Sequence, residues 1–178
     1  ELVNTLKTFD PERSFRSPSV EGLTNNINEV IKDNPELFYD NYEEFYKIPY
    51  RHISSIFYGL HDAWNTEKNI KWDNVLKFIQ NYISQKEFGT KELQLKEATY
   101  KYNHLDIIKA FCRLLSGGMR SDEKAFSSNL LPFVENIIFT FLENHISTEL
   151  KEKDKGKLGS AMHAINSTTG LIIGTLLD

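Results

Sequence analysis

Cysteine is nearly absent from this chain, because Cys112 is the only one among 178 residues. A single cysteine excludes an internal disulfide and a thiolate-rich zinc site, and it fits a reducing compartment such as the cytoplasm. Cys112 shares a helical spacing with Ile108, Phe111 and Leu115. This pattern predicts a buried small hydrophobic side chain rather than a nucleophile.

Long apolar runs and a secretory leader are also missing. The longest apolar run near the end, 171–177, is far shorter than the ~20 residues that a membrane-spanning helix needs. The chain starts at Glu1 without a methionine, and no basic start leads into an apolar stretch. We therefore expect a segment of a larger cytoplasmic protein with no membrane span.

The charge balance lacks the basic excess that is typical of a nucleic-acid binder. Lysine and arginine number 21 against 25 acids, and the formal net charge is -4. The one basic cluster, 151–157, alternates with acids, as in a solvated loop. An alternative hypothesis is a helical solenoid that binds phosphates through a face carrying Lys101, Lys109, Arg113 and Arg120.

Signatures of catalysis and metal binding were sought and not found. The string 155–157 lacks the earlier glycine and the following Ser or Thr of a phosphate-binding loop. His52 and His61 are nine residues apart, which places them on opposite sides of an ideal helix, so they would not chelate one metal. We expect no catalytic, cofactor-binding or metal site. A small enzyme with a dispersed site is a further alternative, and it would require converging polar groups in a pocket.

Helix signals are dense, whereas the Asn-Gly and Asp-Gly turns of β-hairpins are absent. Ser17-Pro18 is typical of a helix start, and Ser116-Gly117-Gly118 is typical of a helix end. Residues 87–102 fit either a long loop or a frayed helix, and 149–159 is predicted to be a charged loop. Apolar spacing predicts about eight helices, over 1–9, 18–33, 35–47, 50–64, 72–86, 103–115, 129–148 and 160–177.

The predicted fold class is therefore all-α. Most of the helices have the length of stacked hairpins, which favours an irregular array of the HEAT or tetratricopeptide type. A compact helical bundle is the alternative, because no sequence repeat is visible. We expect a helical fragment and linker over 1–16 and a single domain over 17–178. The strongly apolar last helix predicts a partner helix packed against it.

The densest aromatic set lies between residues 38 and 50, and most of it is expected to form core between helices. Three tyrosines, Tyr39, Tyr46 and Tyr50, would form an interaction face if they lie outside that core. Asn166 and Ser167 are typical of a helix cap. The alternative for this pair is a contact with a neighbouring repeat.

Three strings in order, at 70–76, 121–132 and 163–170, carry a resemblance. They read Ile-Lys-Trp-Asp-Asn-Val-Leu, then Ser-Asp-Glu-Lys-Ala-Phe followed by Leu-Leu-Pro, then His-Ala-Ile-Asn-Ser with a later glycine. This resembles helical segments in very large bacterial proteins, many linked to antiphage defence, in which a nucleotide-binding or effector module precedes a long helical array. The resemblance covers residues 34–178 and implies a scaffold or sensor segment whose parent carries its chemistry in other domains.

The hypothesis that joins these observations is a non-catalytic helical scaffold segment of a larger bacterial protein. Its expected partner is another protein or the other domains of the same chain, and nucleic acid is the less favoured partner. No cofactor is expected.

Overall fold

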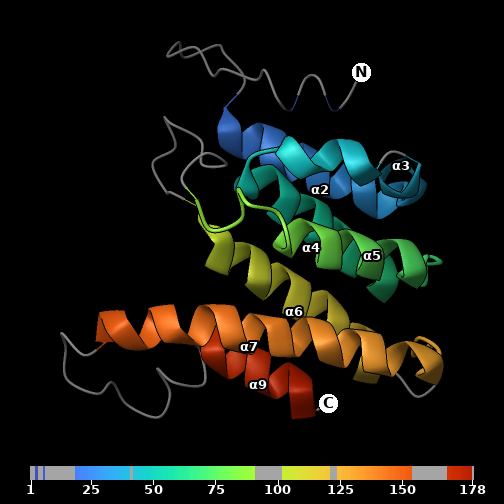
Figure 1. Cartoon of the computed structure of the whole chain (residues 1–178). Coiled ribbons are helices and arrows are strands. Elements are labelled where there is room, and N and C mark those ends of the chain that lie inside the picture. The colour runs from blue at the N-terminus through green and yellow to red at the C-terminus, as the bar shows by residue number, and fades with distance from the viewer. Residues whose placement is uncertain are drawn as a thin grey trace. The chain divides into compact units, whose positions relative to one another are not determined.

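The computed structural model describes residues 3, 6, 19–40, 42–90, 102–120, 124–153 and 168–177 (Figure 1). Every regular element among these residues is a helix, which confirms the predicted all-α fold class. The chain divides into two compact units, residues 1–107 and 108–178. The expected fragment over 1–16 and single domain over 17–178 stay predictions.

Unit 1 is built around α2 (Val20–Asp33) and α4 (Tyr50–Asn65), which pack side by side (Figure 1). The start of α2 is capped by Ser19, whose hydroxyl accepts a hydrogen bond of 2.9 Å from the Gly22 amide. The predicted cap at Ser17 is therefore wrong by two residues. A cap must present its oxygen to the amides of the first turn, and Ser19 does so here.

The segment after Asn34 is not the single helix that the spacing predicts. It forms the short helix α3 (Glu36–Tyr39) and a separate 3₁₀ turn, η1 (Tyr42–Lys47). Asp40 lies at the break, and aspartate competes with helical backbone hydrogen bonds. The break leaves Phe38 and Phe45 buried on either side of it.

Aromatic rings form the core of unit 1. The Phe38 ring centroid is 5.8 Å from that of Phe45, 5.6 Å from that of Phe57 and 5.2 Å from that of Phe78. Phe78 belongs to α5 (Trp72–Ile83), so one cluster joins α3, η1, α4 and α5. Edge-to-face and tilted contacts of this kind favour one packing arrangement over alternatives.

The first turn of α6 (His104–Arg120) belongs to unit 1 and the remainder to unit 2. The predicted end at Ser116-Gly117-Gly118 is wrong, since α6 continues to Arg120. Gly118 is buried, and its carbonyl accepts a hydrogen bond of 3.1 Å from the Phe126 amide. These observations fit a glycine that admits a close backbone approach rather than one that ends a helix.

Unit 2 continues with η2 (Ser128–Leu130), α7 (Leu131–Lys153) and α9 (Thr168–Leu177). Figure 1 shows α9 packed along α7. The predicted charged loop from Glu149 is wrong up to Lys153, because α7 extends through these good helix formers. The core of this unit contains Phe111 stacked on Phe141 at 6.2 Å, together with Val134, Ile137 and Ile138.

Candidate functional site

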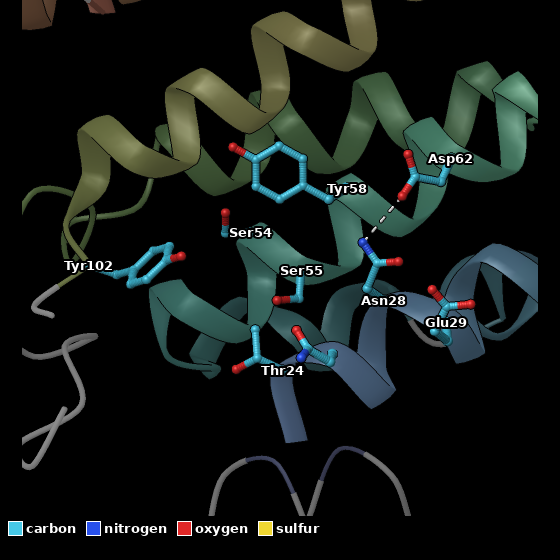
Figure 2. Close-up of a pocket in the computed structure, with 9 residues that line it drawn as sticks. Thr24, Asn28, Glu29, Ser54, Ser55, Tyr58, Asp62 and Tyr102 are labelled. Atoms are coloured by element: carbon cyan, nitrogen blue, oxygen red, sulfur yellow. Dashed lines mark hydrogen bonds between the residues drawn. The ribbon is translucent and has the colours of Figure 1, made fainter. Parts of the chain in front are cut away.

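A polar hollow of about 520 Å³ lies in unit 1 between α2 and α4 (Figure 2). Its lining consists of hydroxyl, amide and carboxylate side chains, and the lining residues that the structure describes include no lysine or arginine. The lining residues are Thr24, Asn25, Asn28 and Glu29 of α2, Ser54, Ser55, Tyr58 and Asp62 of α4, and Tyr102.

The helical period explains how α4 contributes to both the core and the hollow. Its apolar residues Ile53, Ile56, Phe57 and Leu60 share the buried face. Ser55, Tyr58 and Asp62 recur at i, i+3 and i+7 on the opposite side. This second stripe makes α4 polar toward the hollow.

Arg51 connects α4 to α2 at the edge of the hollow. Its Nε donates to the Thr24 hydroxyl over 3.2 Å, and its Nη2 lies 3.1 Å from a Glu21 carboxylate oxygen. Its guanidinium carbon also lies 5.4 Å from the centroid of the Tyr102 ring. Arg51 is itself buried, so these contacts satisfy a charge that burial would otherwise penalise.

Asp62 anchors the other end of the hollow. Its Oδ2 accepts a hydrogen bond of 3.4 Å from the Asn28 amide nitrogen, as the dashed line in Figure 2 shows. Its Oδ1 lies 3.4 Å from Nδ1 of His61. Glu29, the second lining carboxylate, pairs with Lys32 at 3.3 Å on the same helix.

The Ser and Thr hydroxyls that line the hollow differ in how they are satisfied. Thr24 donates to the Val20 carbonyl over 2.6 Å, and Ser55 donates to the Arg51 carbonyl over 3.1 Å. The Ser54 hydroxyl is buried, with 2% of the residue exposed, and it has no hydrogen-bond partner among the described residues. A buried hydroxyl without a partner costs about 1–3 kcal/mol, so Ser54 is the anomalous group of the hollow.

A second candidate surface lies on α9 in unit 2, where the usual helix pattern is inverted. The buried side carries Thr168, Ile172 and Thr175. The outward side carries Leu171, Ile173 and Leu177, of which Ile173 is 45% and Leu177 81% exposed. A helix on the surface of a soluble domain normally places its aliphatic residues inward and its hydroxyls outward.

The predicted tyrosine face is not formed. Tyr39 is 6% and Tyr50 0% exposed, and only Tyr46 is half-buried. The three rings extend the aromatic core instead: the centroid of Tyr39 lies 5.8 Å from that of Phe38, that of Tyr46 5.2 Å from that of Phe78, and that of Tyr50 6.2 Å from that of Phe88. Burial raises the pKa of Tyr39 to about 12.

Tyr50 has a structural role that the sequence did not indicate. Its hydroxyl accepts a hydrogen bond of 2.9 Å from the Gly89 amide and lies 3.3 Å from the Glu87 carbonyl oxygen. Gly89 has a positive φ of 89°, which glycine adopts without strain. Tyr50 thereby fixes the turn at 87–90. This turn is the first part of the segment 87–102, for which the sequence allows either a long loop or a frayed helix.

Several other predicted positions lie outside the described residues, among them Asn166, Ser167 and Lys101. Lys109, Arg113 and Arg120 share one side of α6, and Arg113 and Arg120 are exposed. The nucleic-acid alternative therefore stays a prediction.

The predicted burial of Cys112 is confirmed. Burial raises the pKa of its thiol to about 12, against a smaller lowering by the Thr175 hydroxyl. His52 is fully buried and neither of its ring nitrogens has a partner. Burial, reinforced by the charge of Arg51, lowers the pKa of His52 to about 4. In the part of the chain that the structure describes, no three His, Cys, Asp or Glu side chains gather as metal ligands.

Comparison with known proteins found no matching family model, curated protein or solved structure. The resemblance to bacterial helical arrays thus stays a prediction. Across the described residues, no helix has both the length and the apolar character of a membrane span.

The sequence analysis does not predict the hollow of unit 1, whereas it predicts that the apolar last helix packs against a partner helix; each surface has a sequence signal. The polar residues of α4 recur at helical spacing on the side opposite its apolar face. The alternation of threonines and aliphatics over 168–177 is also visible. The sequence could not show which side of α9 is buried, because both sides contain residues that a core accepts.

Proposed function

We propose that this chain is a non-catalytic, cytoplasmic helical interaction segment, and that the outward side of α9 binds an apolar face of an α-helix from a protein partner. The inverted pattern of α9 carries the proposal. Leu171, Ile173 and Leu177 point away from the unit, whereas Thr168 and Thr175 are buried. Exposed apolar surface of this kind is characteristic of sites that another macromolecule covers.

The chemistry of α9 favours an apolar helix as the occupant. None of the residues Thr168–Leu177 is charged, so the surface offers no complement to a charged partner. Gly174 lies on the outward side, and a Cβ placed on it would meet nothing within 4 Å. A glycine among aliphatic residues lets a second helix approach closely and pack against the backbone.

The proposal agrees with the role that the sequence resemblance implies. In large bacterial proteins with helical arrays, a segment of this kind would act as a scaffold or sensor between other modules. The helix bound by α9 would then belong to a partner that the array recognises.

Site-specific photo-crosslinking tests this function. A photoreactive amino acid replaces Ile173 in the full chain, which is then irradiated in lysate of its source cells, and crosslinked peptides are sequenced. The protein identified is purified and its affinity for the chain is measured directly. The proposal expects the crosslink to map to an amphipathic helix of the partner and the purified pair to bind.

Charge substitutions provide the controls. Ile173→Lys should weaken binding by about tenfold or more, because it places a charge in an apolar contact. Asn129→Lys adds the same charge at an exposed position of η2 and should leave the affinity unchanged. Two results contradict the proposal. In the first, the chain associates with itself and Ile173→Lys abolishes this self-association. In the second, the partner binds Ile173→Lys as tightly as it binds the parent.

A further inference from the structure

The polar hollow of unit 1 belongs to a different part of the chain from α9, and its chemistry points to a different kind of ligand. Two carboxylates, Asp62 and Glu29, contribute negative charge to it, and the described residues of its lining include no lysine or arginine; Arg51, at its edge, is paired with Glu21. Lys32 pairs with Glu29 outside the hollow. Among the described residues, no lysine or arginine forms an ion pair with Asp62. An anionic ligand is therefore disfavoured.

At Ser55 and Asp62, the hydrogen bonds within the hollow leave acceptor oxygens available. The proton of Ser55 is used by the Arg51 carbonyl, so its hydroxyl can only accept from a ligand. The Thr24 hydroxyl both donates to Val20 and accepts from Arg51, which leaves it little further capacity. A ligand that meets Ser55 and Asp62 must therefore donate hydrogen bonds.

Ser54 shows that the protein alone does not satisfy every polar group of the hollow. Its hydroxyl is buried, lines the hollow and has no partner in the described part of the chain. Figure 2 shows this hydroxyl in the space between the Tyr58 and Tyr102 side chains. Buried polar groups are normally satisfied, so Ser54 indicates that a ligand group completes the site.

The aromatic lining favours a cation as that ligand. The faces of tyrosine rings attract positive charge, and the guanidinium of Arg51 already lies against the Tyr102 ring. An alkylammonium group provides three hydrogen-bond donors, one positive charge and no acceptor. These properties match the carboxylate, the acceptor hydroxyls and the rings of the hollow.

We propose that this hollow binds an alkylammonium group, with the Asp62 carboxylate and the hydroxyl oxygens of Ser54 and Ser55 as its acceptors. The group belongs either to a free polyamine or to a lysine side chain of another protein. Both sources present the same chemistry to the site. The proposal does not depend on the function proposed for α9.

Titration of the isotope-labelled full chain, followed by amide NMR shifts, tests the proposal with three probes. Spermidine represents a free polyamine, N-acetyl-lysine methylamide represents a protein side chain, and glucose is the neutral polyol control. Amide shifts centred on α2 and α4 with either amine, but not with glucose, support the site. Tighter binding of spermidine assigns a free amine, and tighter binding of the lysine analogue assigns a protein. Shifts with glucose alone, or no shifts at all, overturn the proposal.

Matched variants separate a specific site from general attraction between charges. Asp62→Asn should weaken amine binding by about tenfold, while Asp73→Asn, an equal change at an exposed position of α5, should not alter it. Equal weakening by both variants contradicts the proposal. Ser54→Ala should also weaken binding, yet the variant should be at least as stable as the parent, because it removes an unpartnered buried hydroxyl. Unchanged amine affinity in Ser54→Ala overturns the assignment independently of Asp62.

Discussion

Gly59 of α4 lies against the backbone carbonyl of Asn28 in α2, so closely that a Cβ on residue 59 would be 2.7 Å from that oxygen. The same Cβ would be 3.0 Å from the Cβ of Ile31. Neither atom is the flexible end of a side chain. The absence of a side chain at residue 59 therefore sets the spacing of α2 and α4, and with it the width of the polar hollow.

Gly59→Ala should destabilise unit 1 by about 1–3 kcal/mol, because the added methyl group overpacks the contact between the helices. This cost exceeds the gain in helix propensity of about 1 kcal/mol. Urea unfolding followed by tryptophan fluorescence measures it, since the two tryptophans, Trp64 and Trp72, both lie in unit 1. Gly22→Ala is the control, because there the nearest atom is the movable Ser19 hydroxyl at 3.2 Å. An unchanged or raised stability of Gly59→Ala would contradict the overpacking argument.

Helical spacing predicted most elements of this fold because, in these helices, the apolar residues that recur at each turn are also the residues that are buried. In α4, the face that carries Ile53 and Phe57 is both apolar and buried. The wrong predictions occur where a residue type is compatible with more than one structural role. Gly118 lies inside α6, and Tyr39 and Tyr50 extend the core, because the contacts that decide these positions come from distant parts of the chain.

The candidate sites were less predictable than the fold for a related reason. The hollow depends on the distance between α2 and α4, which Gly59 sets through a contact with residue 28. No local pattern encodes a distance between two helices. In α9 the sequence provides two acceptable faces, and only packing against the other helices of unit 2 decides that Thr168 and Thr175 are buried.

His52 should make the stability of unit 1 depend on pH. Its folded-state pKa of about 4 is below the ordinary value of 6.5 that applies to the unfolded chain. Between these values the unfolded chain binds more protons, so stability is full above pH 6.5 and decreases as the pH falls toward 4. The shift corresponds to about 3 kcal/mol in total, of which about 2 kcal/mol is lost between pH 7 and pH 5.

His52→Leu tests this dependence, because it removes the titrating ring at similar volume. The loss in the free energy of unfolding between pH 7 and pH 5 should be smaller in His52→Leu than in the parent by about 2 kcal/mol. His61→Asn removes a half-buried histidine of the same helix and should retain the full loss. Equal losses in the parent and in His52→Leu would show that other groups cause the acid sensitivity.

Tyr50→Phe should loosen the turn at 87–90 while leaving the aromatic core in place. The variant deletes the hydroxyl that accepts from the Gly89 amide but keeps the ring, which packs 6.2 Å from that of Phe88. We expect a loss of about 1–2 kcal/mol and faster hydrogen exchange confined to this turn. Exchange measured by mass spectrometry checks the location. Unchanged protection at Gly89 would mean that Tyr50 does not fix the turn.

Gly174→Ala should separate the stability of α9 from its proposed use as a binding surface. The new methyl group meets no atom within 4 Å, so the helix should gain up to about 1 kcal/mol from alanine's better propensity. Binding to the partner helix should weaken, because the methyl group occupies the space through which that helix approaches. Thermal unfolding monitored by circular dichroism measures the first effect, and titration with the purified partner measures the second. A variant that is more stable and binds as tightly as the parent would place the contact away from Gly174.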